Sequence, residues 1–380
     1  MAPIYLDHSA TTLPEPAILD YFHEQLLSLS ANPASLHRLG QAAAQSIQAS
    51  RKIVANALGC KPEEIVWTSG GSESINMALK GYIEANPKRG STIIAAAGEH
   101  AATKETLKYL ASRGYQIRII PLQQNGQIDL AALAQAIDDD TVLITCLHVN
   151  NETGAVHPIE DIVRLRNQKR PLAAIHLDGV QACGKIPVHF SQLGVDLFSA
   201  SGHKFGAPKG IGFLLVRHGI RVSPLIHGGG QQNGRRAGTE NAPLIATLAR
   251  ACAQAVREQA KRYESCQQFR QLLLDELGQR GVSYAMLSPP GGVPQILNLA
   301  FPGLRGETLL HALELSEIYI STGSACSSHH QGPSDVLLAM GNPRAVAECS
   351  VRISFAAVNT PAEISQTAQA IAEACQKYRR

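Results

Sequence analysis

The length, composition and charge of the chain exclude several classes of protein. At 380 residues it is too long for one ordinary compact core, so two domains are expected. Hydrophobic residues make up 44% and charged residues 17%, as in folded enzymes, and the net charge of +3 favours neither nucleic acid nor an anionic membrane as a partner. With no apolar leader or membrane-length apolar run, and eight scattered cysteines without a CxxC pair, the sequence predicts a cytoplasmic protein.

Helical and strand patterns alternate through the first two thirds of the chain. A helix is predicted over 40–58 with Gly59 as its cap, and another from Ser72. Strands are predicted at 64–68, 91–97, 115–121, 141–149, 172–178, 195–201 and 210–216. Short apolar runs of this kind are typical of a buried, mostly parallel sheet in an α/β protein.

The last third of the chain has a different organisation. A long helical region, about 242–280, leads into a mixture of strand and helix patterns that predicts a smaller α+β unit. We therefore predict a large domain over 15–255 and a small domain built from 1–14 and 256–380. The small domain would carry a mobile Gly/Ser-rich loop at about 321–333.

Lys204 and Asp178 form the first candidate pair for chemistry. Lys204 follows a predicted strand and enters a loop rich in Gly and Pro, where an amine could form an imine with an aldehyde cofactor. Asp178 ends another strand, 204 − 178 = 26 residues earlier, and could keep a pyridine nitrogen protonated. Gln181 could donate to a phenolic oxygen. Taken singly, Lys204 is better explained as a solvated loop lysine and Asp178 as the cap of the next turn, and Gln181 can be a plain turn residue.

Two further segments are candidates for binding and for nucleophilic chemistry. Residues 68–74 (TSGGSES) lead from a strand into a helix, where small residues and amide groups could bind a phosphate, although a plain helix cap explains them equally well. Residues 321–328 (STGSACSS) place Cys326 among small polar neighbours, which favours a reactive thiol over a buried one. His329 and His330 follow, but one Cys and two adjacent His do not complete a metal site, and none is predicted.

These segments occur in the order and spacing of one family. The sequence resembles the cysteine desulfurases of the class-V aminotransferase group, which are fold-type I pyridoxal-phosphate enzymes. The matching stretches are YLDHSATT (5–12), NPASLHRLG (32–40), TSGGSES (68–74), GEH (98–100), HVNNETG (148–154), HLDGVQ (176–181), SGHKFGAPKG (201–210), HGGGQ (227–231), RRAGTEN (235–241), STGSACSS (321–328) and VRISF (351–355).

The resemblance implies a cofactor, pyridoxal 5′-phosphate, and a set of residues that bind it. Lys204 would hold the cofactor covalently and then move protons, while Asp178 would pair with the ring nitrogen and Gln181 with the phenolic oxygen. His100 would stack on the ring. The full cofactor-binding set that the resemblance implies is Gly71, Ser72, His100, Asn151, Asp178, Gln181, Ser201, His203, Lys204 and Thr239, the last reaching in from a second subunit.

The resemblance also implies the substrate and the reaction. Asn32, Asn151 and Arg352 would bind the carboxylate of L-cysteine, and Cys326 would accept its sulfur as a persulfide. Lys204, Cys326, His100 and Asp178 form the implied catalytic set. The expected protein is a homodimer that passes sulfur to an acceptor protein for iron–sulfur cluster or other thio-cofactor assembly, with Cys326 as a transient contact to such a cluster.

Other functions remain open at this point. Selenocysteine lyase, acting on L-selenocysteine, is the nearest alternative because it belongs to the same family. A nucleotide-binding dehydrogenase would share the α/β alternation but would need a GxGxxG after a strand, and a non-catalytic partner protein would not need Lys204, Asp178 and Cys326 together. Gly179 and Val180 stand where the family usually has alanine-type residues, so we expect different packing against the cofactor ring.

Overall fold

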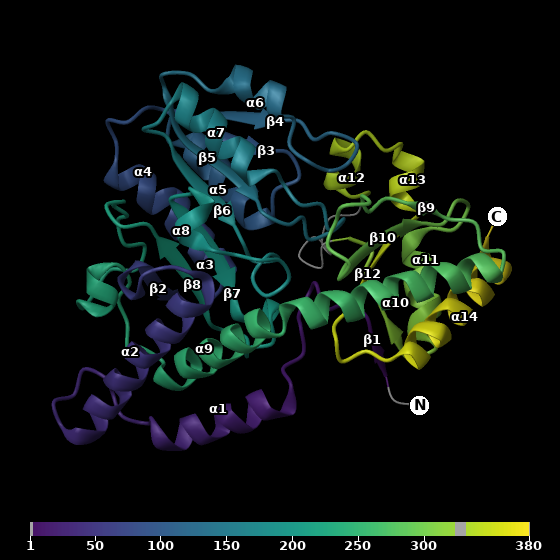
Figure 1. Ribbon diagram of the computed structural model, residues 1–380. Helices are drawn as coiled ribbons and strands as arrows, with labels where there is room; N and C mark the ends of the chain where they lie inside the picture. The colour runs from purple at the N-terminus through teal and green to yellow at the C-terminus, as the bar shows by residue number, and fades with distance from the viewer. Residues whose placement is uncertain (1–2, 324–331, 380) are drawn as a thin grey trace.

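A computed structural model describes residues 3–323 and 332–379 of the chain. A large α/β unit and a smaller α+β unit lie side by side, and helices α9 and α10 run end to end from the first into the second (Figure 1). Cys326, His329 and His330 lie outside the described residues.

The large unit is built on a seven-stranded sheet with the order β2-β8-β7-β6-β5-β3-β4. Only β8 runs antiparallel to the others, so the prediction of a mostly parallel sheet in an α/β fold is confirmed. All seven predicted strands form. Their bounds are β2 (Ile65–Thr68), β3 (Thr92–Ala96), β4 (Gln116–Ile120), β5 (Thr141–Leu147), β6 (Ala174–Asp178), β7 (Leu197–Ser201) and β8 (Gly212–Val216).

Helices cover both faces of this sheet. Alternate residues of β3 point to opposite sides, so that Ile93 packs with the residues of α3 and α5 and Ile94 with those of α2, α6, α7 and α9. Burial on both faces explains why the strands are continuously apolar rather than alternating. The helices of the large unit are α1 (Pro16–Ser28), α2 (Arg38–Leu58), α3 (Gly71–Asn76), α4 (Tyr82–Ala85), α5 (Ala101–Ser112), α6 (Leu130–Ala136), α7 (Ile159–Lys169), α8 (Phe190–Leu193) and α9 (Ala242–Arg257).

The smaller unit has its own sheets and its own apolar core. An antiparallel sheet has the order β12-β10-β9, and β1 pairs with β11 in parallel. The predicted helical region 242–280 forms two helices that break at Glu258. The bounds are β1 (Ile4–Tyr5), β9 (Ala285–Met286), β10 (Ile296–Ala300), β11 (Ile318–Tyr319), β12 (Ser350–Ser354), α10 (Gln259–Gln279), α11 (Gly306–Glu314), α12 (Asp335–Ala339), α13 (Arg344–Glu348) and α14 (Pro361–Tyr378).

The boundary between the two units is crossed by side chains from both ends of the chain. Ile4 and Leu6 pack in the core of the smaller unit, together with residues of α10 and α14. Val293 and Val336, in contrast, pack in the core of the large unit. Apolar side chains from within residues 287–347 pack in the core of the large unit and tie the two units together. The division into domains at 15–255 therefore stays a prediction.

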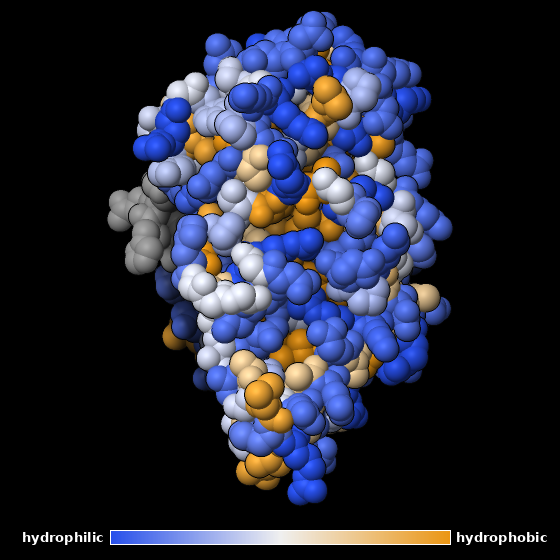
Figure 2. Space-filling view, turned by 90° about the vertical axis from the view of Figure 1, so that its left-hand side faces the viewer, coloured by the Kyte–Doolittle hydropathy of each residue, from blue (hydrophilic) through white to orange (hydrophobic). Residues whose placement is uncertain are grey.

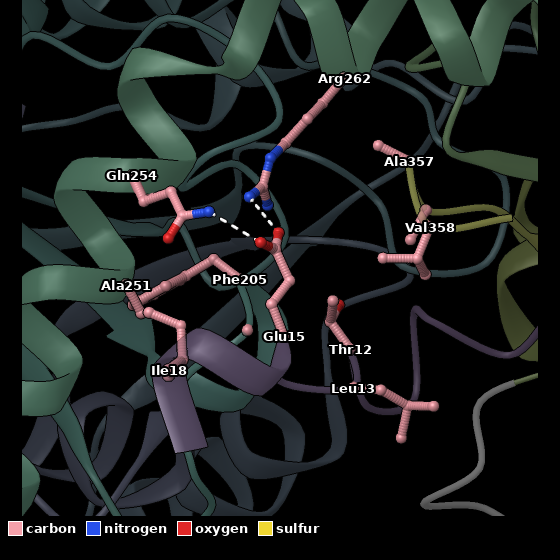
Figure 3. A pocket seen from close by; sticks show the side chains of 12 residues that line it. Thr12, Leu13, Glu15, Ile18, Phe205, Ala251, Gln254, Arg262, Ala357 and Val358 are labelled. Atoms are coloured by element: carbon pink, nitrogen blue, oxygen red, sulfur yellow. Dashed lines mark hydrogen bonds and ion pairs between the residues drawn. The ribbon is translucent and has the colours of Figure 1, made fainter. Parts of the chain in front are cut away.

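The N-terminal segment is held at the junction of the two units by polar contacts (Figure 3). Glu15 accepts hydrogen bonds from Gln254 of α9 and Arg262 of α10, each at 2.8 Å. Arg262 also pairs with Glu258, so one guanidinium links the break between the two helices to the segment that precedes α1. Among the described residues, no helix is long and apolar enough to cross a membrane.

Candidate active site

A cavity of about 150 Å³ opens at the carboxyl edge of the large sheet. Strands β2, β3, β5, β6 and β7 are parallel, so the residues that follow them meet at this edge, as ligand-binding residues do in open α/β sheets. Residues 9–10 and β12 of the smaller unit close the other side. The lining residues are Ser9, Ala10, Gly71, Ser72, Ile75, His100, Leu147, Asn151, Asp178, Val180, Gln181, Ser201, His203, Lys204 and Arg352.

Lys204 stands at the end of a short 3₁₀ turn, Gly202–Lys204, directly after β7. Its Nζ donates hydrogen bonds to the main-chain carbonyls of Ser9 at 2.7 Å and Ala10 at 2.9 Å. Its own carbonyl accepts from the Thr12 hydroxyl at 3.0 Å. The amine is therefore held inside the cavity, which excludes the alternative of a solvated loop lysine.

Asp178 ends β6 beside β7 and is 1% exposed. Burial raises the pKa of its carboxyl to about 6, against the opposing effects of the Val180 amide and of Lys204. Val180 donates its main-chain N–H to Asp178 Oδ1 at 3.0 Å, which fixes the carboxylate. Asp178 forms no ion pair within the described part of the chain, so this buried carboxylate would suit a protonated ring nitrogen as its partner.

Two buried ionisable residues lie near Asp178 in the sheet, His176 on the same strand and Glu99 after β3. His176 bridges Thr145 of β5 at 2.8 Å and Ser199 of β7 at 2.9 Å, and burial lowers its pKa to about 3, so it is a neutral link between the strands. Glu99 accepts from the Leu147 amide at 2.9 Å. Burial, with the neighbouring charge of Asp178, raises the pKa of Glu99 to about 8, so it is neutral at pH 7 and does not repel Asp178.

His100 begins α5 after β3 and presents its imidazole to the cavity. Nδ1 accepts a hydrogen bond from the Ala102 amide at 3.1 Å, which leaves the ring proton on Nε2. Burial, together with the positive charges of Lys204 and Lys104, lowers the pKa of His100 to about 4. A neutral imidazole held in one orientation is suited to lie against an aromatic ring.

The stretch predicted to bind a phosphate lies where β2 passes into α3. Gly71 and Ser72 occupy the first turn of this helix and line the cavity beside Ser201. Gly212 of β8 permits this arrangement, because a Cβ there would lie 2.7 Å from the Cα of Gly70. His203 faces the same end, and its Nδ1 contacts the Thr11 hydroxyl at 2.7 Å. Small residues and helix N–H groups together fit an anionic group.

Gln181 and Val180 line the side of the cavity next to Asp178. Gln181 donates from Nε2 to the carbonyl of Ser9 at 2.9 Å, while its buried Oε1 has no hydrogen-bond partner among residues 3–323 and 332–379. Gly179 has a local explanation, since a Cβ there would overlap the ring of Phe198 at 1.9 Å. Phe198 therefore fills the space that a larger side chain at 179 would need.

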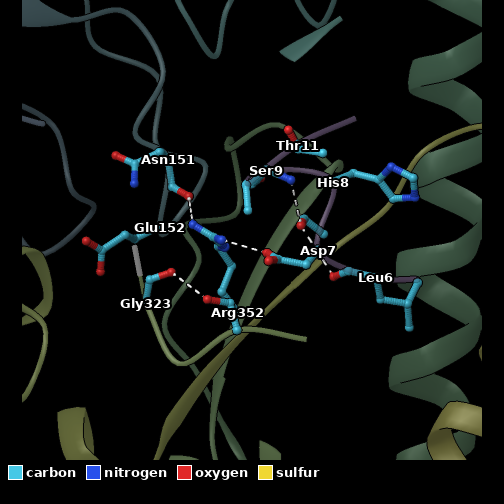
Figure 4. A network of polar contacts seen from close by, with 12 residues as sticks. Leu6, Asp7, His8, Ser9, Thr11, Asn151, Glu152, Gly323 and Arg352 are labelled. Atoms are coloured by element: carbon cyan, nitrogen blue, oxygen red, sulfur yellow. Dashed lines mark hydrogen bonds and ion pairs between the residues drawn. The ribbon is translucent and has the colours of Figure 1, made fainter. Parts of the chain in front are cut away.

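Arg352 is the centre of a buried polar network that joins the two units (Figure 4). Its side chain is 1% exposed. It donates to Asp7 Oδ1 at 2.7 Å and to the Asn151 carbonyl at 3.0 Å. Its buried Nε has no partner within the described part of the chain. The partial neutralisation by Asp7 lets a guanidinium remain buried while a donor is left for a ligand carboxylate.

Three predicted residues are not among the lining residues. Asn32 is exposed, and its Oδ1 accepts from the Ala34 amide. Thr239 is exposed as well, as expected for a residue that would act only in a second subunit. Cys326 lies outside the described residues. Their roles stay predictions, whereas the structure brings the other ten predicted binding residues together at one cavity.

Sequence reasoning missed the contribution of the N-terminal segment. Asp7 pairs with Arg352, and the carbonyls of Ser9 and Ala10 hold the Lys204 amine. All three lie in the stretch YLDHSATT, which the resemblance had marked but to which no role was given. The isolated bridge between Asp7 and Ser354 brings this stretch beside β12. No periodicity in the sequence reveals a pairing between residues more than 340 positions apart.

Asp178→Asn should separate stability from chemistry. The raised pKa means that the folded state binds a proton more tightly than the unfolded state, so the stability that Asp178 contributes is present below about pH 4 and is lost as the pH rises through 6. Above pH 6 the cofactor-free Asn variant should therefore unfold in urea at no lower concentration than the wild type. Its turnover should nevertheless fall by about 10²-fold. Near-normal exchange of the substrate α-proton with deuterium would contradict the role of Asp178.

Comparison with known proteins places the chain in a family. A model of the family described as aminotransferase class-V matches residues 4–367. Proteins named cysteine desulfurase IscS from Dictyoglomus turgidum and Methanosarcina thermophila are each 36% identical to it; the alignments cover 99% of this chain and 95% and 93% of those proteins, respectively.

Solved structures agree with the sequence relatives. One described as a NifS-like protein has a TM-score of 0.93 at 36% identity and covers 99% of this chain and 100% of its own. Another, described as SspA in complex with cysteine, has a TM-score of 0.82 at 32% identity and covers 94% of this chain and 100% of its own. This chain therefore belongs to the aminotransferase class-V family, among relatives that are named cysteine desulfurases.

Proposed function

We propose that this protein is a pyridoxal-phosphate-dependent cysteine desulfurase, which converts L-cysteine to L-alanine and takes the sulfur onto Cys326. One observation carries the proposal: Lys204, Asp178 and Arg352, from three different strands or their ends, converge on one cavity. They supply an amine for covalent attachment, a carboxylate for a ring nitrogen and a guanidinium for an amino-acid carboxylate. Full-length relatives named cysteine desulfurase support the substrate.

The residues present fit the cofactor. The Gln181 amide has a second N–H besides the one that it donates to the Ser9 carbonyl, and Gly71 lines the cavity at a position where a Cβ would lie 2.9 Å from Val180 Cγ2. Lys204 would bind the aldehyde carbon, Asp178 the ring nitrogen and His100 the ring face, while Ser72, Ser201 and His203 would hold the phosphate. When bound, pyridoxal phosphate supplies an electron sink that allows the substrate Cα proton to leave.

Binding of the substrate carboxylate would use Arg352 with Asn151. Arg352 is fixed by Asp7 and by the Asn151 carbonyl, so its plane is already oriented before substrate arrives. Preorganisation of this kind limits the entropy lost on binding and places the substrate Cα beside Lys204. Released from the cofactor, the Lys204 amine would accept the Cα proton, and Ser9 and Ala10 would hold the resulting ammonium by their carbonyls.

Sulfur transfer would then follow at Cys326. The thiolate attacks the substrate sulfur, an S–S bond forms and the C–S bond breaks, with its electron pair remaining on carbon. That carbon gains a proton and leaves as alanine, while Cys326 becomes a persulfide. No separate oxidant or reductant is needed, because the two electrons that the sulfur loses remain on the carbon from which it departs. We expect an acceptor protein to take the persulfide sulfur onward to iron–sulfur clusters or another thio-cofactor.

A second copy of the chain is part of the proposal, because Thr239 and Asn32 lie outside the cavity of their own chain. Figure 2 looks at the side on which α1 and α2 lie and shows apolar side chains at its lower tip. Three leucines of α1, of α2 and of the segment between them are exposed: Leu36 at 91%, Leu27 at 72% and Leu39 at 60%. Apolar side chains with such large exposed fractions favour the view that this surface is covered by another protein chain. We expect sedimentation to give a dimer at assay concentrations, and a fully active monomer would contradict this part of the proposal.

A single assay tests the proposed function. The cofactor-loaded protein is incubated with L-cysteine and, in parallel, with L-selenocysteine, and alanine is quantified together with sulfide or selenide in the presence of a thiol reductant. We expect visible absorbance from the bound cofactor and alanine from cysteine. Activity confined to selenocysteine would instead identify a selenocysteine lyase, and a protein that neither absorbs visible light nor binds added pyridoxal phosphate would overturn the assignment.

A further inference from the structure

Lys185 is a buried lysine next to the active site to which the proposed reaction gives no role. It lies in the turn after β6, follows Gly184 in the left-handed conformation (φ 75°), and is 8% exposed. Its Nζ donates to the main-chain carbonyl of Lys204 at 3.2 Å. That carbonyl therefore accepts from two side chains, because the Thr12 hydroxyl also binds it at 3.0 Å.

The groups that face Lys185 contain no anion to balance its charge. Within residues 3–323 and 332–379, no carboxylate lies within ion-pairing distance of its Nζ. The ionisable groups that interact with it from the surrounding elements are Lys204, His203, His8, Cys183 and Cys266. Burial, reinforced by the positive charge of Lys204, lowers the pKa of Lys185 to about 7.

A purely structural role explains this arrangement poorly. A methionine would fill the same volume without the desolvation that a buried amine requires, and Thr12 already satisfies the Lys204 carbonyl. His8 beside it is also buried and neutral, with a pKa lowered to about 4 by burial. Two neighbouring buried amines oppose each other's protonation, so Lys185, when it carries a proton, lowers the proton affinity of Lys204.

We propose that Lys185 is a positioning residue for Lys204: it fixes the Lys204 main chain and its positive charge favours the unprotonated form of the Lys204 nitrogen. The effect opposes that of the Ser9 and Ala10 carbonyls, which favour the ammonium. The two carbonyls would hold the Lys204 ammonium in place, while Lys185 would make that ammonium release its proton more readily. The inference rests on the proposed function only in assigning Lys204 as the cofactor lysine.

The test compares Lys185→Met with two matched variants. Lys185→Arg retains the charge, and Thr12→Val removes the other donor to the Lys204 carbonyl without changing any charge. The readout is the pH midpoint of the visible absorbance change of the cofactor-loaded protein, which reports the proton on the Lys204 nitrogen. We expect Lys185→Met to raise this midpoint by about one unit, and the Arg and Val variants to stay within a few tenths of the wild type.

A second readout does not depend on the cofactor or on cysteine. Competitive acylation of the cofactor-free full chain at a series of pH values, quantified by mass spectrometry, gives the pKa of the Lys204 amine itself. We expect the same upward shift in Lys185→Met, and urea unfolding at pH 7 should show no loss of stability. An unchanged Lys204 pKa, an equal shift in Thr12→Val, or a destabilised Met variant without a shift would overturn the inference. Failure of the desulfurase assay would leave the acylation result intact.

Discussion

Lys204→Ala should abolish turnover, by a factor of at least about 10⁴, because the proposed role of this residue is both to hold the cofactor and to move the substrate proton. The visible absorbance of the purified protein should be lost or shifted to that of free, noncovalently bound cofactor. The Lys204 side chain lines the cavity, and its amine donates to the Ser9 and Ala10 carbonyls, so the variant should remain folded.

The control for this result is Lys209→Ala, in the same loop but exposed to solvent. It should keep the visible spectrum and the rate of alanine formation within about twofold of the wild type. Borohydride reduction followed by mass spectrometry should add the cofactor mass to the peptide that contains Lys204. Modification of another lysine, or wild-type turnover by Lys204→Ala, would show that the covalent site lies elsewhere.

Cys326→Ala should stop sulfur transfer and leave cofactor chemistry intact. Lys204, Asp178 and the phosphate-binding turn do not include the thiol, so cysteine should still change the visible spectrum of the variant. Alanine and sulfide formation from cysteine should fall by at least about 10²-fold, because Cys326 is the proposed sulfur acceptor. The stopped-flow spectrum and the quantity of alanine together measure the two steps.

Cys349→Ala is the matched control, since this cysteine lies in the smaller unit and is only partly buried. Its alanine formation should equal that of the wild type. Five other cysteines are buried in the described structure, namely Cys146, Cys183, Cys252, Cys266 and Cys375. Desulfuration of cysteine by Cys326→Ala at the wild-type rate would mean that the thiol is not the acceptor.

The strands of the large sheet could be predicted because each is a short apolar run bounded by turns. Their order and the reversed direction of β8 could not, because strand pairing depends on contacts between distant residues. Gly59 was predicted as the cap of α2 from local chemistry, and it adopts φ 61°. The helical region predicted at about 242–280 forms two helices, and their break at Glu258 could not be predicted because no Gly or Pro marks it.

In the candidate site, too, some residues could be identified from local sequence and others only from contacts between distant parts of the chain. Lys204 and Gly71 come shortly after strands and Asp178 ends one, so a parallel sheet brings all three to the same edge. Asp7 and Lys185 gave no such signal, because an isolated acid and an isolated lysine are usually surface residues. Their positions follow from tertiary contacts, namely the pairing of the N-terminal segment with β12 and the turn after β6.

The most direct test of the central claim is a single turnover with ³⁵S-labelled cysteine and an excess of cofactor-loaded protein. After rapid quenching and alkylation, the label is located by mass spectrometry of the proteolytic peptides, and alanine is quantified in the same sample. We predict one equivalent of alanine for each labelled persulfide, with the label on the peptide that contains Cys326. Alanine formed without protein-bound label, or label on a different cysteine, would contradict the assignment.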